Sequence, residues 1–251
     1  MGVARGVKIF IIALSVTSCG KLSNAGEEDT PFLGNAVDPL VRIPMPPDQG
    51  GQSPQETPYC VKNSDGTYHD DVTVEMGSTS EYVWSQGGSC IFRPIREVWA
   101  VMHNQSLMVW KGISSSTFSL RKDPPSGVLY FYEVKYHVDD IINVDWTMNW
   151  YHSVKSGTKE VPTQILINYK KVKGTKFISL WEGSILLQAI TPTVTAFTMR
   201  DQINASRTKP KDSADGLRDV HEKLKTGDPN WGPMGRWPMT SPSLFDVQFP
   251  L

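Results

Sequence analysis

The side chains that could carry chemistry in this chain are few and widely spaced. The five histidines are His69, His103, His137, His152 and His221. His69, Asp70 and Asp71 form the only cluster of metal-ligand types, and it lies on an apparent turn where a solvated role is expected. The sequence lacks a nucleophile elbow, a phosphate-binding loop, a zinc-protease pattern and dinucleotide-binding glycines. It therefore predicts no catalytic residue, no metal site and no cofactor.

Four further ionisable side chains fall on segments that alternate like β-strands. Glu133, His137 and Asp145 lie in the polar phase of their segments, which favours the solvent-facing side. Glu182 is the carboxylate that could face inward, for acid–base work or to anchor a ligand. Gly183 beside it suggests a β-bulge that would turn Glu182 outward. Both orientations stay open, and we assign Glu182 no catalytic role.

Cys19 ends a segment that resembles the export signal of a bacterial lipoprotein. The segment holds two basic residues, a short apolar core and a final quartet, which are Arg5, Lys8, Ile9–Leu14 and Val16–Cys19. The core is far shorter than the roughly 20 residues of a transmembrane helix. The quartet resembles the lipobox, whose cysteine is lipidated on sulfur and becomes the mature N-terminus. The resemblance implies a lipid anchor at Cys19; the alternative is an ordinary signal peptide with a chance cysteine.

The residue after the cysteine bears on the location. Gly20 stands where, in the familiar sorting pattern of lipoproteins, Asp is associated with retention at the inner membrane. The expected location is therefore the bacterial cell envelope, with the lipid in the outer membrane and the domain facing the periplasm.

Two cysteines remain once Cys19 is lipidated. Cys60 and Cys90 most simply form a disulfide in an exported protein. Closing a loop of about 30 residues would stabilise the domain by roughly 3–4 kcal/mol on the chain-entropy model. The alternative, a cysteine nucleophile or metal ligand, has weak support because the sequence holds no Cys-x-x-Cys pair.

Composition divides the chain into four parts. Residues 1–19 are the export signal, 20–58 a tether rich in Gly, Ser and Pro, 59–227 the folded domain, and 228–251 an extension rich in Trp and Pro that packs on the domain. The formal net charge of −1 is too balanced for a nucleic-acid-binding protein. At 39% hydrophobic residues the chain can bury a core of one domain.

The folded part begins with weak strand signals near Thr67–Met76 and Glu81–Ser85, followed by a turn at Gly87-Gly88. Pro94 is placed to begin a short helix, because the apolar residues after it follow i, i+3, i+4 and i+7 spacing; they are Ile95, Val98, Trp99 and Met102. Gln105–Trp110 predicts a second turn or short helix.

The middle of the chain alternates strictly with period two, which predicts antiparallel strands. In 128–138 and 141–154 the apolar phase holds tyrosines in the first run and tryptophans in the second, with Asp139-Asp140 as a hairpin turn between them. Further strands are predicted at Thr163–Lys170, Lys176–Ile190 and Thr193–Asn204. After them, Ser213 is expected to cap a last helix that ends at Gly227 and presents one apolar side.

This order of elements resembles the helix-grip fold of the START-like (SRPBCC) superfamily. The local matches are "IFRPIREVWAVMHNQSLMVW" at 91–110 and "KFISLWEGSILLQAITPTVTAFTM" at 176–199, and the resemblance covers roughly 87–226. The segment before Ile91 and the C-terminal extension depart from the pattern, and the second helix of that fold is hardly visible. The resemblance implies an α+β fold in which a curved antiparallel sheet grips a long C-terminal helix, with short N-terminal helices.

Sheet and helix in that superfamily enclose a cavity for an apolar ligand. The resemblance implies that the ligand-binding residues here are Tyr130, Tyr132, Tyr136, Trp146, Met148, Trp150, Leu217, Val220 and Leu224. The expected function is a membrane-anchored lipoprotein that binds or carries a hydrophobic small molecule or lipid. Two alternatives stay open: a cyclase- or hydrolase-like enzyme, which needs at least two ionisable side chains converging in the cavity, and an interaction protein with a filled core.

Overall fold

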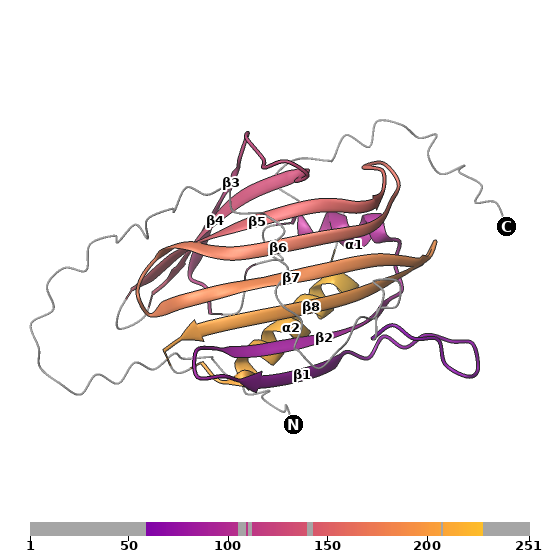
Figure 1. Ribbon diagram of the computed structural model, residues 1–251, viewed down its shortest axis with the longest axis horizontal. Coiled ribbons are helices and arrows are strands. Elements are labelled where there is room, and N and C mark those ends of the chain that lie inside the picture. Colours follow the sequence, from indigo (N-terminus) through magenta and orange to yellow (C-terminus); the bar gives the residue numbers. More distant parts are fainter. Residues whose placement is uncertain (1–58, 105–108, 110–111, 140–142, 207, 228–251) are drawn as a thin grey trace, which may run out of the picture.

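One curved antiparallel sheet of eight strands dominates the computed structural model (Figure 1). The structure describes residues 59–104, 109, 112–139, 143–206 and 208–227. The strands are β1 (Thr73–Ser78), β2 (Val83–Ile91), β3 (Ser115–Leu120), β4 (Tyr130–Val138), β5 (Val144–Gly157), β6 (Pro162–Gly174), β7 (Ile178–Thr191) and β8 (Val194–Ala205). Their order in the sheet is β1-β2-β8-β7-β6-β5-β4-β3. Every neighbouring pair except β2 and β8 is therefore consecutive in the chain.

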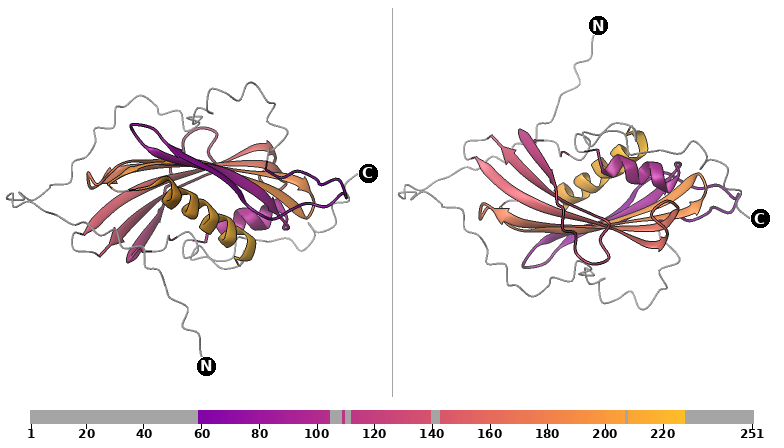
Figure 2. Two further views of the ribbon diagram at one scale, coloured as in Figure 1. Left: turned by 90° about the horizontal axis from the view of Figure 1, so that it is seen from below. Right: turned by 90° about the horizontal axis from the view of Figure 1, so that it is seen from above.

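Two helices lie on the concave side of this sheet, as both views of Figure 2 show. They are α1 (Ile95–Met102) and α2 (Pro210–Thr226). The buried side of α2 includes Leu217, Val220 and Leu224, and this helix packs over β1, β2 and β8. A sheet with one apolar face must cover that face. The two helices cover some strands more than others: α2 contacts β1, β2 and β8, and α1 contacts β6, β7 and β8. Neither described helix combines the length and the hydropathy needed to cross a membrane.

The predicted α+β helix-grip fold is confirmed, with local corrections. Gly87 and Gly88 lie inside β2 and do not form a turn. A Cβ on Gly88 would lie 2.1 Å from the carbonyl oxygen of Phe197, so the glycine permits close strand packing. The serine-rich strand β3 was not predicted, because it contributes little apolar surface beyond Phe118.

The last helix begins earlier than the sequence indicated. It starts at Pro210, so Ser213 lies within the first turn and is buried instead of capping the helix. Gly227 follows the last residue as predicted, but its φ of −65° is not the left-handed conformation of a glycine C-cap. The predicted export signal, tether, C-terminal extension and residue Asp140 lie outside the described residues, as does the segment 105–110 except for Val109.

The predicted disulfide between Cys60 and Cys90 is present. Cys60 and Cys90 pack with Val194 and Ala196 in a small cluster separate from the main core. The disulfide thereby fastens the segment before β1 to the end of β2. It closes a loop with a sequence separation of 30 residues.

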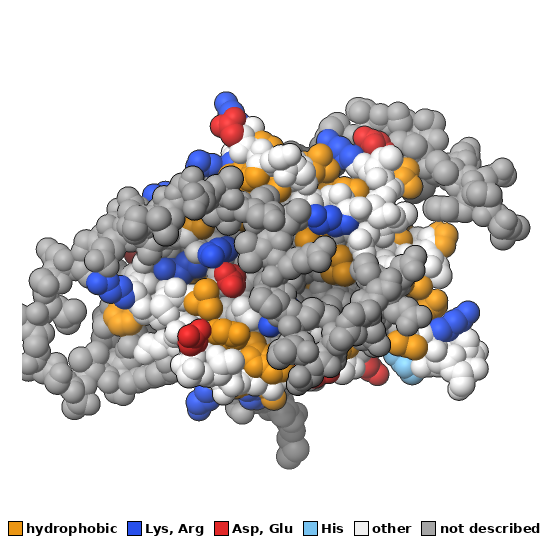
Figure 3. All heavy atoms as spheres, in the orientation of Figure 1, with side chains coloured by type: hydrophobic (Ala, Val, Ile, Leu, Met, Phe, Trp, Pro, Cys, Tyr) orange, Lys and Arg blue, Asp and Glu red, His pale blue; other side chains and the backbone are white. Residues whose placement is uncertain are grey.

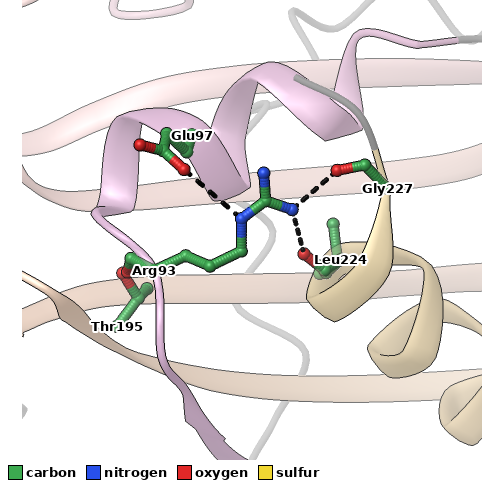
Figure 4. Close-up of polar contacts among 5 residues, drawn as sticks. All are labelled: Arg93, Glu97, Thr195, Leu224 and Gly227. Carbon is green, nitrogen blue, oxygen red and sulfur yellow. Dashed lines mark hydrogen bonds and ion pairs between the residues drawn. The ribbon is translucent and has the colours of Figure 1, made fainter.

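Arg93 joins three elements at the same end of the sheet (Figure 4). Its Nη1 donates to the carbonyl oxygens of Leu224 at 3.3 Å and Gly227 at 2.6 Å, and its Nε lies 3.4 Å from Glu97 Oε2. The carbonyl of Arg93 itself accepts a hydrogen bond from Thr195 Oγ1. Carbonyls in the last turn of a helix have no partner within the helix, so Arg93 satisfies the end of α2 and holds it beside α1.

Replacing Arg93 by Ala is therefore expected to lower the free energy of unfolding by about 2 kcal/mol, because half-buried carbonyls lose a charged donor. Urea denaturation measures this loss. Arg96→Ala is the matched control, since Arg96 is exposed one turn away, and it should cost under about 0.5 kcal/mol. Equal losses for the two variants would contradict the role of Arg93.

Candidate functional site

The register of β4 against β5 builds the candidate site on the concave face. The inward pairs are Tyr130–His152, Tyr132–Trp150, Val134–Met148 and Tyr136–Trp146. Side chains of a strand alternate between faces, so all these residues share the side that carries the helices. Cross-strand partners lie close enough for their rings to touch. The tyrosine run and the tryptophan run of the sequence therefore combine into one aromatic surface.

The rings stack in a row that crosses four strands. Phe118 of β3 lies 4.7 Å from Tyr132, and Tyr132 lies 6.0 Å from Trp150, as measured between ring centroids. Trp150 in turn lies 4.7 Å from Tyr169 of β6. Stacked aromatic rings bury large apolar area with defined geometry. The row makes this part of the concave face rigid and apolar.

A directed chain of hydrogen bonds crosses the edge of this surface. Trp99 Nε1 of α1 donates to His152 Nδ1 at 3.0 Å. A neutral imidazole that accepts at Nδ1 carries its proton on Nε2, and His152 Nε2 lies 3.2 Å from the Tyr132 hydroxyl. That hydroxyl donates to the carbonyl of Met102 at 3.4 Å. These hydrogen bonds position the Tyr132 hydroxyl, and the longest of them is its bond to the carbonyl of Met102.

His103 ends α1 beside the same groups. Its ring centroid lies 4.8 Å from that of His152, and its Nδ1 lies 2.9 Å from the carbonyl oxygen of Trp99. Burial lowers the pKa of His103 to about 4. Burial, and then the neighbouring His103, lower the pKa of His152 well below its usual value. Both rings are therefore neutral at neutral pH, and His103 presents Nε2 as an acceptor.

The tyrosines of the site are held neutral by the same cause. Burial raises the pKa of Tyr132 well above its ordinary value, and it also raises the pKa of Tyr136. A phenol and an imidazole whose pKa values move away from neutrality in opposite directions do not exchange protons at pH 7. The groups can donate and accept hydrogen bonds, but they are poorly matched to acid–base catalysis.

A small pocket opens between the end of α1 and strands β3, β4 and β5. The described residues that line it are Met102, His103, Val109, Phe118, Tyr132, Val134, Tyr136 and Trp150. None of these lining residues is an acid or a Lys or Arg. The space open to the centre of a water molecule is about 10 Å³, close to the volume that one water needs. A larger guest requires side chains of the wall to move.

The structure brings together part of the predicted ligand-binding set. Tyr132, Tyr136 and Trp150 line the pocket. Tyr130, Trp146 and Met148 lie on the same face in register with it. Leu217, Val220 and Leu224 belong to the main core through α2, but they are not among the residues that line the pocket. Helix α2 packs on the same concave face but over a different part of it, over β1, β2 and β8.

The other candidates from the sequence lie on the outside. Glu182 faces the convex side and pairs with Lys170 at 3.3 Å. Simple alternation places it there, because no register shift occurs at Gly183. His137 lies between Asp145 and Asp139 on the convex side, with ring nitrogens 2.7 and 2.8 Å from their carboxylates, while Glu133 lies 4.0 Å from Arg121.

The cluster of His69, Asp70 and Asp71 does not gather as a metal site. Asp70 forms an ion pair with Lys225 of α2, and the His69 carbonyl accepts a hydrogen bond from the Cys90 amide. Among the described residues no group of three histidine, cysteine, aspartate or glutamate side chains is arranged to hold a metal ion.

A second buried polar centre, around Asp201, was not predicted. Its Oδ1 accepts hydrogen bonds from Tyr169 at 2.7 Å and Trp181 at 3.0 Å. Its Oδ2 accepts one from Ser213 of α2 at 3.0 Å, and Ser213 lies 2.7 Å from Ser85 of β2. Three strands and α2 therefore meet at one carboxyl group. Burial raises the pKa of Asp201 to about 6, although these hydrogen bonds oppose the shift.

Both polar centres have a signal in the sequence, which is an ionisable residue in the apolar phase of a strand. His152 continues the inward phase of Met148 and Trp150, and Asp201 continues the inward phase of Phe197 and Met199. An ionisable residue in the apolar phase of a strand is a candidate buried group. Periodicity indicates the burial of such a residue, but it does not indicate which partners from other elements satisfy it.

The Asp201 centre predicts a pH dependence. The folded protein binds the Asp201 proton more tightly than the unfolded chain, whose carboxyl has a pKa near 3.8. Stability from this group is therefore full below that value, falls as the pH rises towards 6, and stays low above 6. The difference in the free energy of unfolding, Asp201→Asn minus wild type, should therefore increase by roughly 3 kcal/mol from pH 3 to pH 8. Chemical denaturation at both pH values measures it.

The exposed Asp123 provides the control for loss of a carboxylate. Asp123→Asn should shift stability by under about 0.5 kcal/mol relative to wild type over the same range. If the free energy of unfolding changed with pH by the same amount in wild type and Asp201→Asn, a buried carboxyl that ionises with difficulty would be contradicted.

Comparison with known proteins finds similar architectures at low sequence identity. The lipid transfer and protein localization domain of human StarD13 has 9% identity and a TM-score of 0.44, covering 63% of this chain and 84% of that chain. A STAR-related lipid transfer protein from Xanthomonas axonopodis has 13% identity and a TM-score of 0.41, covering 66% and 98%. The Zhui aromatase/cyclase from a Streptomyces species has 11% identity and a TM-score of 0.35, covering 61% and 87%.

No protein-family model matches the sequence, and no curated protein does. The similarities to solved structures are too distant to bear on what this chain binds. The architecture itself is clear from the order of the elements, from β2 paired with β8, and from the long C-terminal helix on the concave face. The described part of the chain has the helix-grip fold.

Proposed function

We propose that this chain is a membrane-tethered helix-grip domain that binds one small, mostly apolar and uncharged molecule on its concave face. The observation that carries the proposal is the pocket beside α1, where stacked aromatic rings meet the hydroxyl of Tyr132 and the imidazole of His103. Aromatic walls with a few fixed polar groups are typical of sites that orient an apolar ligand.

The chemistry of the lining favours an uncharged guest. A carboxylate or an ammonium group in this pocket would lose its hydration without meeting an opposite charge among the described lining residues. A hydroxyl or carbonyl group is better matched. Tyr132 can donate to it in place of its 3.4 Å contact with the carbonyl of Met102, and Nε2 of His103 can accept from it.

An enzyme on the same fold is the second candidate, because His103, Tyr132 and Tyr136 do converge on the pocket. The pKa of His103, about 4, argues against it. A general base works best when its pKa lies near the working pH, and burial moves these side chains away from that range. We therefore favour binding over catalysis.

Two valines of similar burial, one inside the pocket and one outside it, and two dyes that differ in charge test the proposal. Val134 and Val144 are 7% and 8% exposed on the same face, but only Val134 lines the pocket. The uncharged dye N-phenylnaphthylamine should bind saturably and one to one. Val134→Phe should weaken binding about tenfold, or roughly 1.4 kcal/mol, because the added ring occupies the space of the guest. Val144→Phe should bind like wild type, and fluorescence titration measures all three.

Charge discrimination adds a second readout. Anilinonaphthalene sulfonate has the same ring system with an added anion, and it should bind at least about tenfold more weakly to the wild-type pocket. Circular dichroism confirms that each variant is folded. Absence of saturable uptake by the wild-type protein would overturn the proposal and favour an interaction protein with a filled core.

The proposed tether is tested separately. Cys19→Ser should abolish labelling by a fatty-acid analogue in a bacterial host and leave unprocessed precursor, because the lipidated sulfur is missing. Cys60→Ser/Cys90→Ser is the control, since these cysteines form the disulfide and their loss should leave labelling intact. Labelling that survives Cys19→Ser would contradict the anchor.

A further inference from the structure

Three exposed large apolar side chains lie at one end of the sheet, while two others lie on its edge strands. Among the described residues, the exposed large hydrophobic side chains are Val61 (62%), Phe92 (52%), Leu120 (51%), Met76 (48%) and Val161 (39%). Met76 and Leu120 lie on the two edge strands, β1 and β3. Figure 3 shows hydrophobic side chains along the right-hand edge of the molecule, where Figure 1 places the β5–β6 and β7–β8 turns.

Strand register places two of these residues in one line. Ile91 pairs with Thr195, so Phe92 is level with Val194, which itself follows the β7–β8 turn. Gln164 pairs with Gln188, and continuing this register brings Val161 level with Thr191 at the end of β7. The line crosses β2, β8, β7 and β6, which corresponds to roughly 14 Å at ordinary strand spacing.

Val61 joins this line through the disulfide. It follows Cys60, whose Cα lies 4.8 Å from that of Cys90, two residues before Phe92. The described chain also enters the domain here. Tyr59 lies against Gly88, and its hydroxyl accepts a hydrogen bond from Gln86. The segment that follows Cys19 in the sequence is therefore connected to the domain at Tyr59, close to Val61. We call Val61, Phe92 and Val161 the apolar end.

We propose that the apolar end rests on the lipid surface that holds the N-terminal anchor; the inference depends on the anchoring of Cys19 proposed above. The length of the segment 20–58 permits the contact but does not enforce it: as the tether that its composition predicts, about 40 residues would have a root-mean-square span near 35 Å. A domain held this close has an effective concentration near the membrane in the millimolar range. Even a weak apolar contact is then largely occupied.

The surroundings of the apolar end suit the boundary between lipid and water. Exposed Lys62 is next to Val61. Lys159 precedes Val161 in the β5–β6 turn, with Glu160 between them, but its Nζ lies over the ring of Tyr130, 5.6 Å from the centroid, so Lys62 is the lysine that supports the proposal. Lysine side chains extend from an apolar boundary to the polar headgroups, and anionic headgroups attract them. Phe92 and the two valines provide the apolar side chains that enter the interface.

Photochemical mapping on the mature lipidated protein tests the inference. The protein is reconstituted in vesicles of phosphatidylethanolamine and phosphatidylglycerol that contain a phospholipid with a diazirine near the glycerol. Peptides that contain Val61, Phe92 or Val161 should carry about tenfold more lipid adduct than those that contain Met76 or Leu120. Val61→Ser/Phe92→Ser should abolish this excess. Met76→Ser/Leu120→Ser, at positions that are 48% and 51% exposed, should leave it unchanged.

Flotation of the vesicles reports the anchor independently. Every variant should float with the vesicles, because the lipid on Cys19 is retained. Floating protein with adducts spread evenly, or with an excess at Met76 or Leu120, overturns the lipid contact and leaves the anchor standing. If lipid adducts are absent and an added lysine-reactive crosslinker joins two copies of wild-type protein but not of Val61→Ser/Phe92→Ser, the contact is with a second copy and the lipid proposal is overturned. Wild-type protein that does not float removes both proposals.

Discussion

The register between β4 and β5 is the constraint on which the concave face depends. It places Tyr132 opposite Trp150 and Tyr136 opposite Trp146, and it brings His152 level with Tyr130. A slip by one residue would turn one complete set of side chains to the convex face, where Glu133 and Lys135 now lie. Three of the inward pairs carry rings on both strands, and exposing those rings would make such a slip costly. The aromatic row, the hydrogen bonds that begin at Trp99 and the pocket therefore all depend on this one register.

Two buried polar centres attach the helices to the sheet, one for each helix. The first joins α1 to β4 and β5 through Trp99, His152 and Tyr132, and all its groups are neutral because burial disfavours their charged forms. The second joins α2 to the sheet through Ser213 and Asp201. A carboxyl in that position costs stability when it ionises, yet its bonds specify where α2 lies. Arg93 then fixes the far end of α2 beside α1.

The uneven cover of the sheet explains where a ligand can bind. Helix α2 packs over β1, β2 and β8, while α1 reaches the middle strands. The concave surface of β3, β4 and β5 is covered in the described structure by the last residues of α1 and by Val109. The proposed binding site therefore lies to one side of the long helix. The proposed lipid contact is at the end of the sheet where Cys60 and Phe92 lie, so the start of the described chain, the disulfide and the apolar end are adjacent.

The sequence by itself determined the features that depend on local periodicity and local chemistry. These are the paired alternating runs of β4 and β5, the apolar stripe of α1 after Pro94, the long final helix and, from the cysteine count, the disulfide. Only the tertiary structure decided which inward residues surround space and which fill the core, because alternation reports burial and not vacancy. It alone brought His103 to Tyr132 and Ser213 to Asp201, and it placed Leu217, Val220 and Leu224 away from the pocket. Such contacts join residues far apart in sequence, and their geometry follows from the order and curvature of the whole sheet, which no local pattern contains.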